Sequence, residues 1–399
     1  MTTALPLDAH GPADFQKHAV QFSGTGGDYF RLWLSNLLLT LVTLGIYTPW
    51  ARRRRVQYFY RNTLVAGDPV DFVASSRRMA TSFLLVVMVY VLINMLSSQG
   101  LNEAVGVITL TIAALVPWLW RSAQRFRLGN TTWRGLRFDF QATTREAYIA
   151  AWPLLAAALT VAVASLVLPS LGVGAATRVA PALAVGLSVV ALLLSGVVLI
   201  RLRFNFLVLQ MTRTALGGQQ GRFKASFGAF SKIAMLALAV AVVAYVAVFA
   251  LIAGLLAGIA GSLSGVLKGD GAAGKIVMFA VLMLAVIPLL LAPAAMALSA
   301  WQALVFRTVW RNAGLSTLAR SKCDLKIGAF VMLRTKNIGL TVITLGLYRP
   351  FAAVSEYRMK AESVHLYTRS DIDALASRLA QQKDALGDAA ADMLGFDIV

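Results

Sequence analysis

Residues 79–98 read MATSFLLVVMVYVLINMLSS, a stretch that contains no charged side chain. A helix needs about 20 apolar residues to cross about 30 Å of hydrocarbon, so this stretch is long enough to span a membrane. Further segments of the same kind, without Asp, Glu, Lys, Arg or His, are 104–120, 148–168, 181–200, 233–260 and 276–304. The sequence therefore predicts a polytopic membrane protein with six spans.

Composition supports this class. The chain has 399 residues, of which 58% are hydrophobic and 14% are charged. Typical soluble domains have about 45–50% and about 25%. These values exclude a soluble globular enzyme and a disordered chain. The single Cys323 excludes an intrachain disulfide and therefore a disulfide-stapled secreted domain.

The basic residues are distributed unevenly among the connections between these spans. The connections 51–79, 121–147, 201–232 and 305–336 hold seven, six, six and seven Lys or Arg residues. The alternate connections 99–103, 169–180 and 261–275 hold none, one and two. Short cationic loops stay on the cytoplasmic side, so we expect the first set to be cytoplasmic. The net charge of +19 then indicates contact with anionic lipid headgroups rather than nucleic acid.

A motif near the N-terminus recurs near the C-terminus at a constant offset of 301 positions. Its shared positions are Asn36, Thr40, Thr43, Gly45, Tyr47 and Pro49 in the first copy, and Asn337, Thr341, Thr344, Gly346, Tyr348 and Pro350 in the second. The second copy leaves only 338–351 apolar, about 21 Å of helix, which is short of a full bilayer. The first, 29–50, is long enough to cross if Arg31 snorkels. Two readings stay open: both segments re-enter the membrane, or both span it.

The glycines of this motif allow two interpretations. In the first, each glycine ends its helix in a turn near the cytoplasmic interface, where the tyrosine anchors and the proline stops the helix from resuming. In the second, each glycine packs against a neighbour inside a continuous helix. Replacement of glycine by alanine distinguishes the two.

The basic connections carry a weaker repeat. The pattern Asn62-Thr63-x3-Gly67-x4-Phe72 recurs from Asn130 to Phe140, and in part from Thr214 to Phe223. Gly-Asp-Pro turn chemistry and alternating apolar residues predict a short cytoplasmic β-hairpin in each copy. The connection 305–336 shows no clear copy.

Two groups of residues are candidates for function. Arg52, Arg53, Arg54 and Arg55 follow an apolar segment and are expected to anchor the topology and contact lipid phosphates, with a binding patch for a soluble anionic partner as the alternative. Asn94, Pro117, Pro288 and Pro293 lie within the predicted spans and could line a cavity, although kinked packing helices are the commoner explanation of the prolines and an interhelical hydrogen bond that of Asn94.

No metal or cofactor site is expected. His10, His18 and His365 lie outside the six spans and form no Cys/His cluster. The glycines of 269–275 resemble nucleotide-binding loops, but Ile276 stands where a P-loop needs Ser or Thr, and no predicted strand precedes them.

The segment from Phe22 to Ala51, with Tyr29-Phe30 and the Thr-Leu-Gly-x-Tyr motif, closely resembles one family, as does the following Tyr58–Thr63. It is the YjgN-like family of bacterial inner-membrane proteins, a family of unknown function. The likeness extends over the whole chain. It implies an inner-membrane location and no activity, cofactor or site residue.

The predicted fold is thus an all-α polytopic helix bundle with six spans, two short terminal membrane segments and small cytoplasmic β-hairpins. We expect an N-terminal segment 1–28, a membrane domain 29–351 and a C-terminal region 352–399 with an acidic amphipathic helix. One functional hypothesis is a passive or facilitated pathway for a small molecule or lipid. The other is a non-transporting scaffold that binds lipid or partner proteins through its basic loops. An intramembrane enzyme is less favoured than either.

Overall fold

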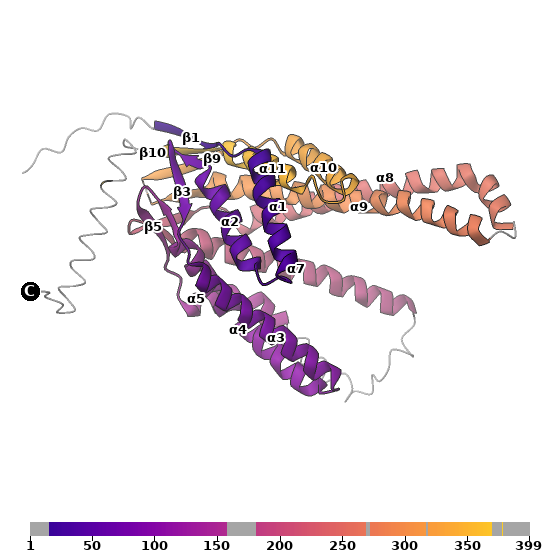
Figure 1. Cartoon of the computed structure of the whole chain (residues 1–399), viewed down its shortest axis with the longest axis horizontal. Coiled ribbons are helices and arrows are strands. Elements are labelled where there is room, and N and C mark those ends of the chain that lie inside the picture. Colours follow the sequence, from indigo (N-terminus) through magenta and orange to yellow (C-terminus); the bar gives the residue numbers. More distant parts are fainter. Residues whose placement is uncertain (1–15, 158–180, 269–271, 317, 369–376, 378–399) are drawn as a thin grey trace, which may run out of the picture. The chain divides into compact units, whose positions relative to one another are not determined.

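The computed structural model describes residues 16–157, 181–268, 272–316, 318–368 and 377 (Figure 1). The chain divides into two compact units. The first consists of residues 1–224, 311–322 and 361–399, and the second of residues 225–310 and 323–360.

The first unit contains a closed antiparallel β-barrel of ten strands, each of three to seven residues. In chain order the strands are β1 (Gln16–Phe22), β2 (Thr63–Val65), β3 (Asp68–Phe72), β4 (Thr131–Trp133), β5 (Leu136–Phe140), β6 (Thr214–Leu216), β7 (Gln219–Phe223), β8 (Ala313–Leu315), β9 (Ala319–Cys323) and β10 (Val364–Thr368). Each strand pairs with its neighbour in the chain, and β1 pairs with β10 to close the ring. Closure leaves the described strands without a free edge.

Tight hairpins provide the strand pairs. Val65 pairs with Asp68 across Ala66 and Gly67, which both have positive φ, of 52° and 86°. Two consecutive residues with positive φ form the turn whose twist suits a two-residue hairpin. The same geometry occurs at Arg134 and Gly135, and at Gly217 and Gly218. The three hairpins predicted from the sequence therefore exist.

A fourth hairpin, β8–β9, lies in the connection 305–336, where the sequence showed no copy. Leu315 pairs with Ala319, so three residues separate these strands instead of two. Because of the extra residue, β9 ends at Cys323, one position later than the spacing of the other three hairpins would place it. A search at fixed spacing cannot detect a repeat that is longer by one residue.

Apolar side chains fill the barrel. Trp133, Leu136 and Leu216 are buried at its centre, and the half-buried side chains packed on them come from several hairpins: Val65, Ala66, Val70, Phe138, Leu315, Leu318 and Leu366. At the other end of the strands, Phe72 meets Tyr60 and Phe140 meets Trp120, edge to face. Burial of large apolar groups from many strands stabilises a barrel whose individual pairings are short.

Helices connect β1 to β2, β3 to β4, β5 to β6, β7 to β8 and β9 to β10. They are α1 (Gly26–Val42), α2 (Thr48–Arg61), α3 (Ser76–Ser98), α4 (Asn102–Gly129), α5 (Thr144–Ala150), α7 (Pro181–Arg213), α8 (Phe227–Lys268), α9 (Ala272–Asn312), α10 (Ile327–Ile343) and α11 (Arg349–Glu362). The chain is therefore built from five strand–helix–strand repeats, and the first and last are completed by pairing of β1 with β10.

The repeats share one backbone contact at the junction of strand and helix. The residue that follows the long strand donates its N–H to the carbonyl of the residue before the neighbouring short strand. This bond joins Ser23 to Asn62 at 3.0 Å and Val73 to Asn130 at 2.9 Å. It recurs between Gln141 and Arg213 and between Lys224 and Asn312. Because all these junctions lie at one end of the hairpins, the helices of every repeat leave and rejoin the barrel at that end.

The prediction of an all-α bundle with six spans is wrong. Ten strands form a barrel, and four helical segments in the described part of the chain are long and apolar enough to cross a membrane: Ser76–Ser98, Ala104–Gly129, Leu193–Arg213 and Phe227–Gly254. Most of the predicted span 148–168 lies outside the described residues, and the predicted span 276–304 lies within α9, only part of whose side chains are described. The sequence predicted three of the hairpins, but not β1, the β8–β9 hairpin, β10 or the closure of all strands into one barrel, because short strands carry little periodicity.

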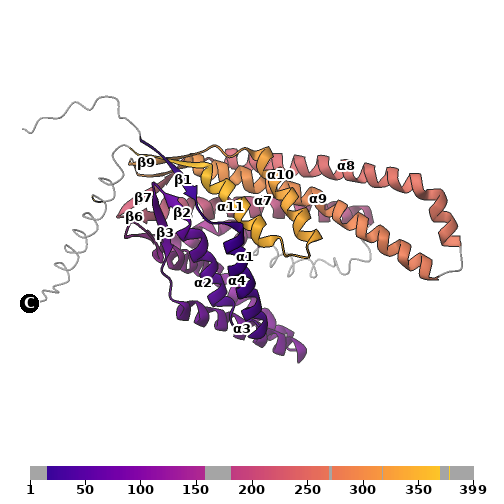
Figure 2. The ribbon, with the colours of Figure 1, turned by 45° about the horizontal axis from the view of Figure 1, so that its top comes forward.

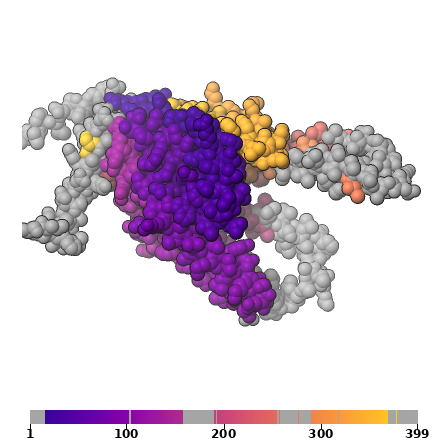
Figure 3. All heavy atoms as spheres, viewed as in Figure 1, coloured from indigo at the N-terminus to yellow at the C-terminus, as the bar shows by residue number. Residues whose placement is uncertain are grey.

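Within each unit the helices run in antiparallel pairs. In the first unit, α3 and α4 lie side by side, and the indigo and purple atoms of this N-terminal part form a continuous surface (Figures 1 and 3). In the second unit, α10 and α11 are neighbours, whereas α8 and α9 run apart from each other over most of their length (Figure 2). Helix α8 continues through Gly258, Gly261 and Gly265 to Lys268. The predicted tail helix lies outside the described residues except for residue 377.

Candidate functional site

The repeated motif forms a sharp turn between α1 and α2. Helix α1 ends at Val42, and Leu44 and Gly45 follow with φ of 49° and 90°. The Thr43 hydroxyl accepts the N–H of Tyr47 at 3.0 Å, and Pro49 lies in the first turn of α2. Gly45 is therefore a turn glycine, as the first interpretation of the motif predicted, and not a glycine inside a continuous helix.

The second copy has the same geometry between α10 and α11. Leu345 and Gly346 have φ of 50° and 94°, and the Thr344 hydroxyl accepts the N–H of Tyr348 at 3.0 Å. The two turns lie in different units of the chain and reproduce one another bond for bond. The motif therefore specifies this local structure without help from its surroundings.

The tyrosines of the motif stack on the next aromatic residue. The rings of Tyr47 and Trp50 are 6.1 Å apart, and those of Tyr348 and Phe351 are 5.7 Å apart. Arg54 donates to the Tyr47 hydroxyl at 3.1 Å. An apolar ring with a polar hydroxyl is the arrangement that suits a boundary between hydrocarbon and water.

The four arginines that follow the first turn divide into two kinds. Arg53 donates to the Ser76 hydroxyl at 2.7 Å and thereby links α2 to α3, while Arg54 holds Tyr47. Arg52 and Arg55 are exposed. The first turn of α3 adds two further exposed arginines, Arg77 and Arg78. We call the four exposed residues, Arg52, Arg55, Arg77 and Arg78, the α2–α3 arginine cluster.

A salt bridge fixes the barrel end of α2 beside this cluster. Arg61 Nε lies 2.9 Å from the Asp71 carboxylate on β3. The hydrogen bond from Arg61 lowers the pKa of Asp71, with a further contribution from the charge of Arg53. The same bond raises the pKa of Arg61. Both groups are therefore ionised at neutral pH.

The arginine cluster borders an apolar helix surface. Beyond Arg77 and Arg78, α3 presents a run of exposed large apolar side chains: Leu84, Leu85, Val86, Met88, Tyr90, Val91 and Leu92. A row of exposed apolar residues that begins at a basic turn is the pattern of a helix entering a bilayer.

In the second unit, the motif asparagine lies in a polar network. Asn337 is 1% exposed, and its Nδ2 lies 3.1 Å from Ser355 Oγ and 3.1 Å from Glu356 Oε1. Arg334 lies 3.8 Å from the Glu356 carboxylate and donates to the Gln302 side chain. This network joins α9, α10 and α11.

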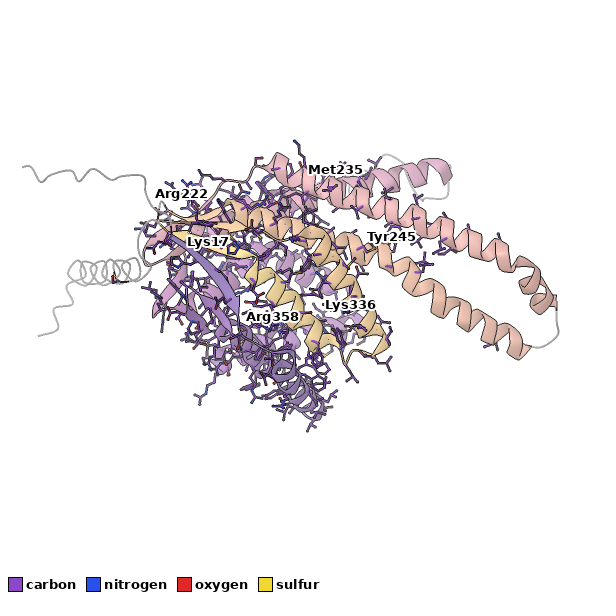
Figure 4. The ribbon with its side chains drawn as sticks, turned by 90° about the horizontal axis from the view of Figure 1, so that it is seen from above. Lys17, Arg222, Met235, Tyr245, Lys336 and Arg358 are labelled. Carbon is purple, nitrogen blue, oxygen red and sulfur yellow. The ribbon has the colours of Figure 1, made fainter. Side chains whose placement is uncertain are left out.

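Lys360 lies at the barrel end of α11 among aromatic rings. Its Nζ is 4.8 Å from the centre of Phe330 and 5.8 Å from that of Phe306. Burial lowers the pKa of Lys360, and the charge of Arg334 lowers it further, against an opposing effect of Glu356. On the outer faces, Lys336 on α10 and Arg358 on α11 are exposed (Figure 4).

The first copy has no equivalent network. Asn36 is 7% exposed, and no hydrogen bond like those of Asn337 Nδ2 is found for it among the described residues; the Oδ1 of Asn36 is buried without a partner, as is the Oδ1 of Asn337. The positions that match Ser355 and Glu356 are Arg54 and Arg55, so the carboxylate that binds Asn337 has no counterpart.

The residues proposed to line a cavity lie on three helices, α3, α4 and α9. Asn94 is exposed on α3 and donates to the Tyr90 carbonyl of its own helix at 2.8 Å. Pro117 is buried in the first unit and Pro293 in the second, and the side chain of Pro288 lies outside the described part. In the described residues no three His, Cys, Asp or Glu side chains group as metal ligands.

Comparison with known proteins places the chain in a family. The family described as "Bacterial protein of unknown function (DUF898)" matches residues 17–393. The chain belongs to this family. It is also similar to the inner membrane protein YjgN of Salmonella typhimurium, with 32% identity over 144 residues, or 36% of each chain. The YjgN proteins of Escherichia coli O157:H7 and K12 are 32% identical over 132 residues, or 33% of each chain.

The aligned segment spans about a third of the length of these curated relatives. No solved structure matches the chain. The relatives are inner membrane proteins by name, and four long apolar helices fit a membrane protein. The resemblance inferred from the Thr-Leu-Gly-x-Tyr motif is thus confirmed.

Sequence reasoning missed the polar network of the second unit and half of the arginine cluster. The repeated Asn337 was a signal for the network, but its partner Glu356 stands where the first copy has Arg55. Arg77 and Arg78 were counted as loop charges, and only the packing of α2 against α3, where Arg53 bonds Ser76, brings the first turn of α3 to the arginines of α2.

Proposed function

We propose that this protein is a non-catalytic membrane platform that binds anionic lipid headgroups at the cytoplasmic face of the bacterial inner membrane. In this proposal the barrel lies in the cytoplasm and the long helices enter the bilayer. The observation that carries it is the α2–α3 arginine cluster, where exposed guanidinium groups from two packed helices border an exposed apolar helix surface. Guanidinium groups match phosphate oxygens in geometry and charge.

The orientation rests on two independent features. All repeats leave the barrel at one end, so the barrel hairpins lie on one side of any membrane that the helices enter. The connections that contain four of these hairpins carry most of the Lys and Arg of the connections, which favours the cytoplasmic side.

A passive pathway for a small molecule or lipid, the other hypothesis, receives less support. Trp133, Leu136 and Leu216 are buried next to the hairpin turns and pack against side chains from several other hairpins, which favours a closed end of the barrel over an open one. A pathway would have to run between helices.

Lipid binding is tested by charge removal at matched positions. The variant Arg52→Gln/Arg55→Gln removes two exposed charges that support no described contact, whereas Arg53 and Arg54 are left in place because they hold Ser76 and Tyr47. The control variant Arg137→Gln/Arg320→Gln removes two exposed charges from barrel strands. Each surface charge contributes about 1 kcal/mol to binding of anionic membranes, so the first variant should lose more than tenfold in affinity.

The measurement is native mass spectrometry of protein purified in non-ionic detergent and titrated with phosphatidylglycerol or phosphatidylcholine. We expect preference for phosphatidylglycerol, loss of that preference in the first variant and no change in the control. Equal losses in both variants would indicate nonspecific attraction by the net charge.

Orientation is tested with single cysteines in a Cys323→Ser background. Arg137→Cys and Arg320→Cys report on the barrel, and Gln99→Cys reports on the connection between α3 and α4. In intact cells an impermeant maleimide should label only Gln99→Cys. Labelling of the barrel positions would reverse the orientation.

A further inference from the structure

The turn between α1 and α2 satisfies its own backbone N–H groups. Thr43, Leu44 and Gly45 donate their N–H groups to the carbonyls of Leu39, Leu41 and Thr40 at 2.7–3.1 Å. The N–H of Ile46 goes to the Thr43 carbonyl, that of Tyr47 to the Thr43 hydroxyl and that of Thr48 to the Gly45 carbonyl. Every N–H from Thr43 to Thr48 therefore has a partner within the turn, and Pro49 has no N–H.

The turn between α10 and α11 repeats this pattern at each position. The N–H groups of Thr344, Leu345, Gly346 and Leu347 go to carbonyls of Leu340, Val342, Thr341 and Thr344, and that of Arg349 goes to the Gly346 carbonyl. The Thr344 hydroxyl again accepts the N–H of Tyr348. A turn in water does not need such completeness, because water accepts from free N–H groups.

Both turns expose large apolar side chains. Val42 and Leu44 are 81% and 93% exposed, and Ile343 and Leu345 are 78% and 95% exposed. Leu44 and Leu345 also adopt positive φ, which a residue with a Cβ disfavours by about 1 kcal/mol. In water, a leucine at this position costs strain and exposes apolar surface without any compensating contact.

We propose that each Thr-Leu-Gly-x-Tyr turn is the tip of a re-entrant hairpin buried in bilayer hydrocarbon. Hydrocarbon offers no hydrogen-bond partners, so a non-helical segment enters it only when its polar groups are satisfied internally. The threonine hydroxyl supplies the acceptor that the turn itself lacks, and the leucine side chain gains from burial in lipid. This inference rests on the membrane placement proposed above. It adds that the α1–α2 and α10–α11 hairpins enter the bilayer without crossing it.

Helix length and charge limit how far the hairpins reach. Helix α1 has 17 residues, or about 25 Å, and begins with Asp28 and Arg31 in its first two turns. After the turn, charge returns at Arg52. Since arginine snorkels by only a few ångströms, the tip stays within the leaflet next to the barrel.

The second hairpin is shallower than the first. The first charged residue after the turn is Arg52 in the first hairpin and Arg349, at the position that matches Thr48, in the second. The first charge therefore lies four positions closer to the tip in the second hairpin. Four helical residues correspond to about 6 Å. Leu44 should therefore lie deeper than Leu345.

The test places an environment-sensitive fluorophore, NBD, on single cysteines in a Cys323→Ser background. The protein carries Leu44→Cys or Leu345→Cys and is reconstituted in phosphatidylglycerol/phosphatidylcholine vesicles that contain lipids with nitroxides at defined depths. We expect blue-shifted emission at both positions, strongest quenching by mid-chain nitroxide at Leu44→Cys, and quenching by a shallower nitroxide at Leu345→Cys.

Two reference positions separate this inference from the membrane placement itself. Arg137→Cys should report water on the barrel side, and Gln99→Cys should report water on the opposite side. If an impermeant quencher reaches Leu44→Cys, from either side, the re-entrant tip is refuted. If Gln99→Cys and Arg137→Cys are reached from the same side, the membrane placement fails as well.

The role of the hydroxyl is tested by Thr43→Val and Thr43→Ser. Valine keeps the shape and leaves the Tyr47 N–H without a partner, whereas serine keeps the acceptor. Thr43→Val should move NBD at Leu44→Cys to a more polar, less quenched environment, and Thr43→Ser should not. Equal behaviour of the two variants would show that the hydroxyl does not support insertion.

Discussion

The two copies of the repeated motif form the same turn, but different residues lie on the helices beside it. The turns of α1–α2 and α10–α11 share their φ angles and hydrogen bonds. Exposed arginines follow the first turn, and Asn36 lacks the bond by which Asn337 Nδ2 contacts Glu356 in the second copy, although the Oδ1 of both asparagines is buried without a partner. The backbone turn is therefore the same in the two copies, and the residues on the helices beside it differ.

The difference assigns different tasks to the two hairpins. The first copy offers charge to an external partner, because Arg52 and Arg55 project from α2 without a carboxylate beside them. The second copy uses its charges internally, since Arg334 and Glu356 lie 3.8 Å apart beside Asn337. Lipid binding is therefore expected at the first copy and structural rigidity at the second.

The largest expected effect concerns the asparagines. Asn337→Leu removes the donor that Glu356 and Ser355 share and should destabilise the protein by about 2 kcal/mol, because a charged acceptor loses its partner. Both substitutions remove a buried Oδ1 that has no partner, but Asn36→Leu breaks no bond like that of Asn337 with Glu356 and should be neutral or stabilising. Thermal unfolding in detergent, followed by tryptophan fluorescence, measures both. Equal losses would show that the two sites are supported alike.

Substitution of either turn glycine is expected to lower stability by the same amount, and by less than Asn337→Leu. Gly45→Ala and Gly346→Ala should each cost about 1 kcal/mol, since alanine disfavours a φ near 90° and no atom lies within 4 Å of the added carbon. The control is Gly339→Ala, inside α10 and equally uncrowded, which should gain up to about 1 kcal/mol of helix propensity. Unfolding midpoints of the three variants distinguish strain from a general effect of substitution.

Lys360 should lower the stability of the protein at neutral pH, and the first copy has no lysine at the matching position. The matching position in the first copy is Phe59, whereas burial lowers the pKa of Lys360. A lowered pKa means that stability is fully present above the unfolded value, about 10.4, and is lost as pH falls through the folded value. Lys360→Met should therefore stabilise the protein by less than about 1 kcal/mol at neutral pH, an advantage that vanishes above pH 10.4. A destabilised variant would show that contacts of the ammonium group outweigh its burial.

The smallest effect is expected at the base of α2. Asp71→Asn removes the ion pair with Arg61, which is exposed to solvent and so contributes less than about 1 kcal/mol. Because the pKa of Asp71 is lowered in the fold, this stability is present above about pH 3.9 and is lost as pH falls through the folded pKa. The stabilities of wild type and variant should differ at pH 7, and the difference should shrink as the pH falls below about 3.9. In the second copy Glu362 replaces Arg61, so no such pair is expected there.

Several features were accessible from the sequence because they depend on neighbouring residues. Uncharged stretches such as 79–98 indicated membrane helices, and the motif around Gly45 and Gly346 indicated a turn. Two-residue hairpins with Gly67, Gly135 and Gly218 were predicted for the same reason, since φ is decided locally.

The barrel was not accessible, because its defining contacts join distant parts of the chain. β1 pairs with β10, with Gln16 opposite Thr368, and neither strand shows which partner it needs. The apolar centre collects Trp133 from one hairpin, Leu216 from another and Leu366 from the last strand. Individually these are short apolar stretches of the kind that any loop contains.

The sequence by itself thus indicated long apolar helices, the charge asymmetry and the turn geometry, which follow from hydrophobicity and backbone sterics within a few residues. Tertiary structure alone decided that the hairpins close into one barrel and that Arg53 on α2 meets Ser76 on α3. It also decided that Asn337 Nδ2 bonds Glu356, a bond without a counterpart at Asn36. Burial and hydrogen bonding between distant residues depend on how the whole chain packs, and a local pattern carries no information about them.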